Sequence, residues 1–253
     1  MIGNTILMYA YHPMTRNYSR KDYFSGTQNW DVTQDKNNTL YFANNSGLLV
    51  YDSKTWTTIP ITNGTNVRSV AFDGASRIYA STFNDFGYFE KGKQGKLEYI
   101  SITNQATFKS QSSNELFNIH VSGNKVYFQG NKSVYLYENN LLSRIDTDYE
   151  IENSSVVNNI LFISTPRNGI FMLNGKMFIR IQGSEILENK RVSAFLPYKK
   201  GKLLIVTHFH GVFLFDGFQV TRFYTSFDNF LMTNQVFCGT EAVVVFVTFY
   251  QVI

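Results

Sequence analysis

The sequence predicts an all-β protein assembled from repeated four-stranded units. The first observation is the composition: 16% of the 253 residues are aromatic, with 23 Phe and 16 Tyr, against 4 Pro. Aromatic and β-branched side chains fit the pleated, half-buried surface of a sheet. The second is that no stretch of about 11 residues has the apolar spacing of three and four that an amphipathic helix requires. The third is an internal repeat.

The repeat is a short, mainly apolar segment that recurs five times. Its five copies are LYFANN from Leu40, IYASTF from Ile78, VYFQGN from Val126, LFISTP from Leu161 and LLIVTH from Leu203. Their starting positions differ by 38, 48, 35 and 42 residues. Units of four strands that repeat about every 40 residues are typical of the blades of a β-propeller, so each copy predicts one blade.

Each unit has the same four elements in the same order. An introductory strand comes first: NWDVTQD, VRSVAFD, LFNIHVS, SVVNNIL and RVSAFLP. The repeated segment is the second strand, and a third follows a short turn: GLLVYD, GYFE, SVYLYE, GIFML and GVFLFD. A polar turn leads to the fourth: WTTIPI, LEYISI, LLSRID, MFIRI and FQVTRFY. The predicted blades span approximately residues 26–62, 66–103, 115–147, 154–182 and 190–225, with a partial sixth over 233–253.

A meander of four strands exposes both of its faces, so one unit alone cannot bury its apolar side chains. Radial stacking solves this because each blade covers its neighbours and leaves only short edges. Gly47, Gly87, Gly169 and Gly211 precede the third strand, which predicts tight hairpins with positive φ. A sandwich or jelly roll is the alternative all-β interpretation, but neither requires the same four-strand order five times.

The last segment, Gln235–Ile253, starts like the introductory strand of a sixth unit and then becomes almost entirely apolar. VVVFVTF occupies the place of the next strand, but no Gly-marked third strand or polar turn follows. The sequence therefore predicts a truncated propeller fragment. An exposed apolar run of high β propensity also predicts self-association through the open blade edge.

The net charge, the single cysteine and the apolar segments argue against a nucleic-acid partner, a cysteine-based zinc site and a membrane span. The net charge of +4 is modest, and the densest basic groups, Arg16–Lys21 and Lys199–Lys202, fall in predicted turns or surface segments, so we expect no nucleic-acid partner. The single Cys238 excludes an internal disulfide and a cysteine-based zinc site. MIGNTILMYA lacks the basic region of a signal peptide, and Ala242–Ile253 is too short to cross a bilayer. We therefore expect no membrane contact for this segment.

Familiar catalytic motifs are absent from the sequence, which contains no HExxH, GxSxG, Walker or GxGxxG pattern. His208 and His210, two residues apart in VTHFHGVF, are expected on one face of a strand, but no third or fourth metal ligand accompanies them. YDSKTW, Tyr51–Trp56, weakly resembles the Asp-box of sialidase propellers, yet its position favours a simple turn. We therefore expect no enzyme activity, no cofactor and no metal site.

The binding candidates lie where the second strand of each unit ends, because propellers usually present ligands on turns and strand ends at one mouth of the channel. Aromatic faces stack on sugar rings and amides hydrogen-bond hydroxyl groups, so this mixture suits an oligosaccharide or another small ligand. Trp30 and Trp56 are instead predicted to pack between blades. The predicted ligand-binding residues are Asn44, Asn45, Phe83, Asn84, Asn131, Arg167, Asn168, His208 and His210.

One stretch resembles a known family. YSRKDYFSGTQNWDVTQDKNNTLYFANNSGLLVYDSKTW, Tyr18–Trp56, is similar to the N-terminal propeller of bacterial periplasmic sensor regulators with two-component-regulator-propeller repeats. The resemblance covers about residues 13–238 and is also carried by Val67–Asp73, Asn84–Glu90 and Phe227–Cys238. In the most similar branch, a triple-tyrosine domain, a transmembrane helix and a cytoplasmic helix-turn-helix domain follow the propeller.

The resemblance implies an incomplete propeller of the seven-bladed type that lies in the periplasm. The function it implies is that of a ligand-sensing domain, here without its output domains, of a membrane-spanning transcriptional or two-component regulator that responds to glycan-related signals. Two alternatives stay open. A glycan-active enzyme resembling the sialidases would show an arginine and carboxylate cluster at the channel mouth. A protein-interaction scaffold would show an apolar edge or groove and no cluster of charged or catalytic residues at the channel mouth.

Overall fold

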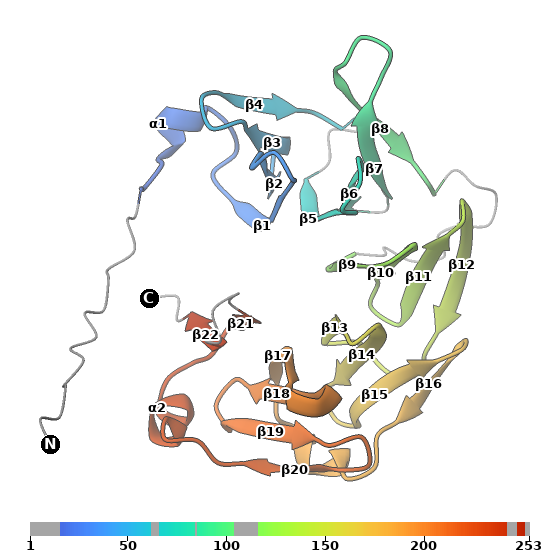
Figure 1. Ribbon diagram of the computed structural model, residues 1–253, viewed down its shortest axis with the longest axis vertical. Helices are drawn as coiled ribbons and strands as arrows, with labels where there is room; N and C mark the ends of the chain where they lie inside the picture. Colours follow the sequence, from blue (N-terminus) through green and yellow to red (C-terminus); the bar gives the residue numbers. More distant parts are fainter. Residues whose placement is uncertain (1–15, 62–65, 84, 104–115, 242–246, 251–253) are drawn as a thin grey trace, which may run out of the picture.

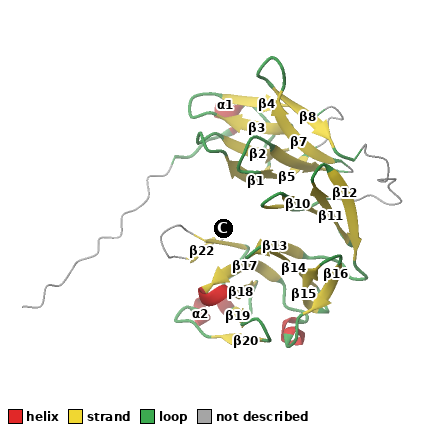
Figure 2. Ribbon diagram, turned by 45° about the vertical axis from the view of Figure 1, so that its right-hand side comes forward, coloured by secondary structure: helices red, strands yellow, loops and turns green. Residues whose placement is uncertain are grey.

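Five four-stranded antiparallel sheets are arranged around one axis, as Figure 1 shows. The computed structural model describes residues 16–61, 66–83, 85–103, 116–241 and 247–250. In each sheet, which we call a blade, the strand order follows the chain order. The blades are stacked like the vanes of a fan, which is clearest in Figure 2. The predicted all-β propeller of four-stranded blades is confirmed.

The strands of each blade are consecutive in the chain. The first blade contains β1 (Asn29–Gln34), β2 (Leu40–Asn44), β3 (Gly47–Tyr51) and β4 (Trp56–Ile59). The second contains β5 (Val67–Phe72), β6 (Ile78–Thr82), β7 (Phe86–Lys91) and β8 (Leu97–Ser101). The third contains β9 (Ile119–Ser122), β10 (Lys125–Gln129), β11 (Ser133–Glu138) and β12 (Leu141–Asp146).

The fourth blade contains β13 (Asn153–Val157), β14 (Ile160–Thr165), β15 (Gly169–Asn174) and β16 (Met177–Arg180). The fifth contains β17 (Val192–Tyr198), β18 (Lys202–Thr207), β19 (Val212–Phe215) and β20 (Val220–Phe223). After them, β21 (Cys238–Glu241) pairs with β22 (Val247–Tyr250) in a two-stranded sheet. Residues 242–246, which include part of the predicted VVVFVTF strand, lie outside the described residues.

The first strand of each blade is the innermost one. In Figure 1, β1, β5, β9, β13 and β17 lie nearest the centre of the arc, and β21 continues the row. Asp31 shows how neighbouring inner strands are linked, because its Oδ2 accepts hydrogen bonds from Ser69 Oγ at 2.6 Å and from Val70 N at 3.0 Å. The inner strands thus line the inner side of the arc.

Strand direction determines which turns share a face of the ring. Since the strands of a meander alternate in direction, the turn between the second and third strands lies on the same face as the connection to the next blade. We call this the upper face and its turns the upper turns. The turns between the first and second strands and between the third and fourth strands lie on the opposite, lower face.

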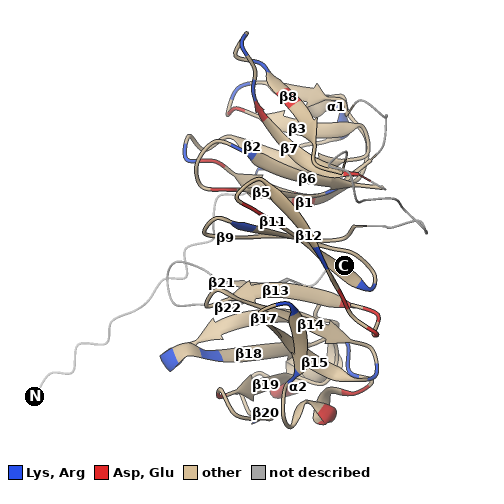
Figure 3. Cartoon of the chain, turned by 90° about the vertical axis from the view of Figure 1, so that its right-hand side faces the viewer, with Lys and Arg blue, Asp and Glu red and all other residues tan. Residues whose placement is uncertain are grey.

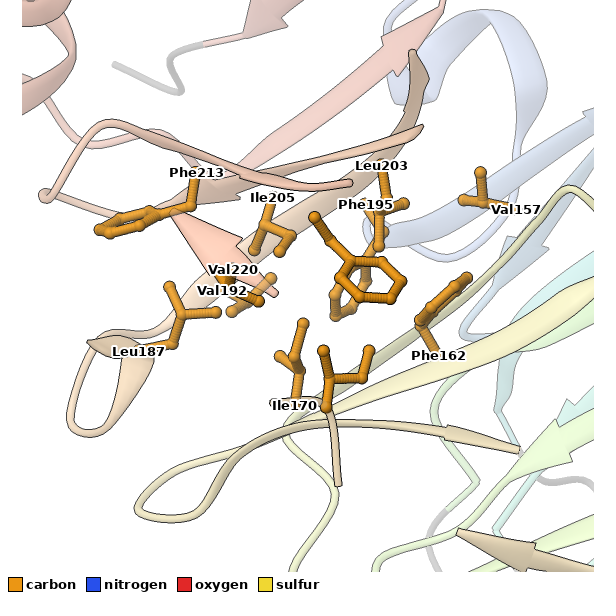
Figure 4. Packing of buried hydrophobic residues seen from close by; sticks show 12 residues of the cluster. Val157, Phe162, Ile170, Leu187, Val192, Phe195, Leu203, Ile205, Phe213 and Val220 are labelled. Carbon is orange, nitrogen blue, oxygen red and sulfur yellow. The ribbon is translucent and has the colours of Figure 1, made fainter. Parts of the chain in front are cut away.

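Apolar side chains fill the spaces between neighbouring blades. Figure 4 shows the cluster in which Phe162 and Ile170 of the fourth blade meet Val192, Phe195 and Ile205 of the fifth. The rings of Phe162 and Phe195 stack with their centroids 6.1 Å apart, and both isoleucines are fully buried. Burying a side chain of this size contributes about 1.5–3 kcal/mol. Each blade is therefore stabilised by its neighbours, as radial stacking requires.

The four predicted hairpin glycines divide into two kinds. Gly47, Gly169 and Gly211 have φ values of 127°, 74° and 71°, which other residues rarely adopt. Gly87 does not, and the prediction of positive φ is wrong there, because this residue lies within β7. A Cβ atom on Gly87 would lie 2.0 Å from the carbonyl oxygen of Ile100. Glycine is needed at this position so that β8 can approach closely.

The prediction that both tryptophans pack between blades is wrong for Trp56, whereas Trp30 meets the second blade through Arg68 of β5. Trp56 on β4 packs against Tyr18, Tyr23 and Tyr51, which belong to the first blade or to the segment that precedes it. Trp30 on β1 is 47% exposed. The alternation of a strand predicts two faces but does not reveal which of them a neighbour covers.

Short helices occur among the strands, and the sequence did not predict them. They are α1 (Arg20–Tyr23), η1 (Ser184–Leu187), η2 (Lys199–Gly201) and α2 (Asp228–Thr233). Among the described residues, no helix is long and apolar enough to cross a membrane. Figure 3 shows that basic and acidic residues are spread over the blades, mostly at turns and strand ends.

Candidate functional site

The predicted ligand-binding residues lie at the upper face. They are Asn44 and Asn45 in the first blade, Phe83 in the second, Asn131 in the third, Arg167 and Asn168 in the fourth, and His208 and His210 in the fifth. Asn84 lies outside the described residues. Because each upper turn belongs to a different blade, the structure distributes these residues along the arc.

The first upper turn is held from inside by Asn44. Its side chain is completely buried, and Oδ1 accepts hydrogen bonds from Ser25 Oγ, Gly26 N and Ser46 N at 2.9–3.0 Å. Its Nδ2 donates to Gly26 O at 2.8 Å and to Asn29 Oδ1 at 2.7 Å. The Asn44 side chain is therefore not open to a ligand and instead orders the turn around it.

The second upper turn contains a buried carboxylate that the sequence analysis missed. Asp85 accepts hydrogen bonds from Ser101 Oγ at 2.7 Å, Thr103 Oγ1 at 2.6 Å and Tyr99 OH at 3.2 Å. Burial and the nearby carboxylate raise the pKa of Tyr99. The hydrogen bonds from these hydroxyl groups to Asp85 hold the turn in place. Phe83, which lies in the same turn, is 45% exposed.

A hollow opens at the upper face between the third and fourth blades. Its volume is about 450 Å³, within the roughly 300–1,000 Å³ of small-molecule sites. The lining residues are Asp148, Tyr149 and Glu150 from the connection between the blades, and Thr165, Pro166, Arg167 and Asn168 from the fourth upper turn. Two predicted binding residues, Arg167 and Asn168, thus meet a segment that the sequence analysis did not single out.

Backbone hydrogen bonds anchor the connection that forms one rim of this hollow. Thr147 N donates to Lys132 O at 3.0 Å, and Ile151 N donates to Asn131 O at 2.7 Å. Both acceptors belong to the third upper turn. The predicted residue Asn131 therefore contributes its carbonyl group to the position of the rim, although it does not line the hollow.

The other rim is a turn closed by a threonine. Thr165 Oγ1 accepts a hydrogen bond from Asn168 N at 3.0 Å and donates to Gly169 O at 3.0 Å. Across the hollow, the Tyr149 ring lies against Phe171 with a centroid distance of 5.1 Å. Tyr149 remains 37% exposed, so a ligand can reach its ring.

The hollow combines one aromatic ring with groups of both charges. Arg167 is exposed and forms no ion pair with any described acidic residue. Next to the lining in the chain, Glu152 Oε2 and Ser164 Oγ are buried and make no hydrogen bond within the described residues. Their backbones are joined, because Glu152 N donates to Ser164 O at 2.9 Å. A buried polar atom without a partner costs about 1–3 kcal/mol, and neither of these two residues lines the hollow.

A half-buried histidine and a buried serine join the third and fourth blades. Ser154 Oγ lies 2.7 Å from His120 Nε2 and 2.5 Å from Gln129 Oε1. The first distance fits a nucleophile and its base. However, Ser154 donates its proton to Gln129 Oε1, so His120 donates to the serine and cannot accept from it. Burial lowers the pKa of His120 to about 4 and keeps the ring neutral. The arrangement links inner strands.

His208 and His210 do not share a strand face, contrary to expectation. β18 ends at Thr207, and both histidines lie in the turn that follows. His208 Nδ1 donates to Val236 O at 2.9 Å, and its ring meets Phe237 edge-on at 5.0 Å between centroids. His208 therefore anchors the segment that leads to β21. Within the described residues, no three His, Cys, Asp or Glu side chains are grouped to hold a metal ion.

Comparison with known proteins supports the fold. No family model and no curated protein matches the sequence. Among solved structures, a catalytically inactive variant of virginiamycin B lyase from Staphylococcus aureus with quinupristin has a TM-score of 0.68 at 10% identity, covering 93% of this chain and 80% of that one. YCF48 bound to D1 peptide has a TM-score of 0.58 at 10% identity, covering 78% and 69%.

Sensor domains also occur among the similar structures. The extracellular domain of a hybrid two-component system, BT3049 of B. thetaiotaomicron, has a TM-score of 0.47 at 13% identity. The alignment covers 93% of this chain and 40% of that one.

The lyase structures correct one expectation. The sequence predicted no enzyme activity because familiar motifs are absent, but propellers with TM-scores of 0.61–0.68 to this chain are lyases. The hollow of this chain is lined by two segments far apart in the sequence, and a search for contiguous motifs misses an arrangement of this kind. At identities of 10–11% the likeness shows the fold and assigns no role to any residue.

Proposed function

We propose that this chain is a ligand-binding propeller whose ligand is a glycan-derived molecule held in the upper-face hollow. The observation that carries the proposal is the lining, which brings the exposed ring of Tyr149 together with Arg167, Asn168 and two carboxylates. Aromatic rings stack on the apolar faces of sugars, while amide, guanidinium and carboxylate groups hydrogen-bond sugar hydroxyls.

The role that we propose for this binding is sensing. The chain would serve as the periplasmic ligand-sensing domain of a membrane-spanning transcriptional or two-component regulator. The support is the resemblance of Tyr18–Trp56, and of residues 13–238 more broadly, to the propellers of such regulators. The distribution of the upper turns over separate blades is compatible with this role, because a ligand that bridges two blades favours one arrangement of both.

Calorimetric titration of the purified chain with a panel of acidic and neutral oligosaccharides tests the binding. We expect saturable heat with at least one sugar, and Tyr149→Ala or Arg167→Ala should weaken its affinity by about tenfold or more. Phe218→Ala is the matched control, because it removes a ring that is 83% exposed from the β19–β20 turn at the lower face. Equal weakening by all three variants, or no heat with any sugar, would contradict the proposal.

A second candidate function is supported by the charges of the same hollow. Asp148, Glu150 and Arg167 provide the arginine and carboxylate cluster that distinguishes a glycan-active enzyme from a simple receptor. Paired carboxylates supply the acid and base of glycosidic bond cleavage. Incubating the bound sugar with the chain and analysing products by mass spectrometry decides between the two. Turnover that Glu150→Gln abolishes without loss of binding would favour the enzyme.

A further inference from the structure

Trp30 is an exposed tryptophan at the start of an inner strand. The pairing of β1 with β2 shifts between Asn29 and Asp31, so Trp30 is the extra residue of a β-bulge. The side chain is 47% exposed, although tryptophan is highly buried in most folds. Bulges redirect side chains and are frequent beside functional sites. Because β1 begins at the upper face, this bulge lies at the upper face, on the inner edge of the first blade.

The ring is held in place by two neighbours. Its Nε1–H donates to Asn45 Oδ1 at 2.7 Å, and the guanidinium carbon of Arg68 on β5 lies 4.2 Å from the ring centroid. A cation at this distance over an indole face is attracted by the ring. The two contacts come from different blades, so the orientation of Trp30 is tied to the packing of the first blade on the second.

A second layer of hydrogen bonds supports Asn45. Its Nδ2 donates to Gln28 Oε1 at 2.9 Å, and its backbone N–H donates to Gln28 O at 3.2 Å. The same segment is held from below by the buried Asn44. Several hydrogen bonds therefore fix the position of a ring that remains open to solvent. An exposed ring with this much support is preorganised for contact with a ligand.

We propose that Trp30 is a saccharide-stacking site at the upper face, distinct from the hollow between the third and fourth blades. Its neighbours Gln28, Asn29 and Ser46 are exposed and carry amide or hydroxyl groups. An indole with the Arg68 guanidinium over its ring and neutral hydrogen-bonding groups nearby fits the apolar face and the hydroxyls of a sugar ring. A nucleobase would also stack, but single-stranded nucleic acid additionally requires a basic groove.

This inference rests on the proposed ligand class, and the two tryptophans of the chain allow a separate test. In the Trp56→Phe variant, Trp30 is the sole tryptophan, and its fluorescence reports contact with a sugar directly. We expect a saturable change in emission and protection from acrylamide quenching with at least one oligosaccharide of the panel. Trp30→Phe, in which Trp56 is the only indole, should show neither change.

Affinity provides the second readout. Trp30→Ala should weaken binding by about tenfold or more, the effect of removing one stacked ring, while Trp30→Phe should retain most of the affinity. Circular dichroism confirms that each variant is folded. Saturable heat without any change in Trp30 emission would overturn the stacking site and leave the proposed function intact. Neither heat nor an emission change with any sugar would overturn both.

Discussion

Replacing Asn44 by alanine should destabilise the first blade strongly, although this residue was expected to contact a ligand. The substitution removes five hydrogen bonds, three to Oδ1 and two from Nδ2, from a side chain that is completely buried. At about 0.5–1.5 kcal/mol each, and with partners such as Ser46 able to bond to water, we expect a loss of about 3 kcal/mol in the free energy of unfolding.

Urea denaturation followed by far-UV circular dichroism measures this loss. Asn131→Ala is the matched control, because Asn131 also lies in an upper turn but is exposed, and it should cost less than about 0.5 kcal/mol. The two variants therefore separate an internal support from a surface amide. A loss below about 1 kcal/mol for Asn44→Ala, or equal losses for both, would refute the reasoning.

Three further predictions concern the framework. Gly87→Ala should lower the free energy of unfolding by about 2 kcal/mol or more, because the new methyl group collides with the Ile100 carbonyl. Thermal or urea unfolding measures this loss, and an unchanged free energy would show that β8 can move away. The pKa of His120 is about 4 in the folded chain and near 6.5 in the unfolded chain. The contribution of the neutral ring to the free energy of unfolding is therefore fully present above pH 6.5, and up to about 3 kcal/mol of it is lost as the pH falls towards 4. His120→Gln should flatten that slope in urea titrations at several pH values, and an unchanged slope would contradict the assignment. Arg222→Ala should lower the free energy of unfolding by about 1–2 kcal/mol, because Arg222 donates to Asp228 Oδ2 at 2.9 Å in a mostly buried pair. Hydrogen exchange in α2 should become faster, and unaltered exchange there would contradict the prediction.

The strands could be predicted from the sequence because their signal is local and repeated. Val126 and Tyr127 of β10 are buried, as are Leu203 and Leu204 of β18, so the second strands read as continuous apolar runs. Strands covered on both faces produce this pattern, and five copies at regular spacing leave few alternative folds. The physical cause of the pattern is the stacking of the blades.

Side-chain environments could not be predicted in the same way. Asn44 and Asn45 are adjacent amides in one turn, yet the first is completely buried and the second is partly exposed. The difference depends on the segment around Gly26, which folds back over the turn. Gly87 and Gly169 likewise occupy equivalent places in the repeat, but only the latter has a positive φ. A repeat specifies the backbone path more closely than the contacts of each residue.

The candidate hollow was predicted only in part for a related reason. Arg167 and Asn168 were identified because they end a repeated strand, whereas Tyr149 and Glu150 belong to a connection with no counterpart in the repeat. Hydrogen bonds to Asn131 and Lys132 bring this connection to the fourth upper turn. Such a meeting of segments is tertiary information. The acidic and aromatic run DTDYEIEN was the available signal.

Hydrogen–deuterium exchange of the chain with and without a bound oligosaccharide reports directly which face of the propeller the ligand covers. We expect slower exchange in residues 148–152 and 165–168, with no change in the lower turn 216–219. Protection confined to lower turns, or no protection at ligand concentrations that saturate the calorimetric heat, would contradict an upper-face binding site.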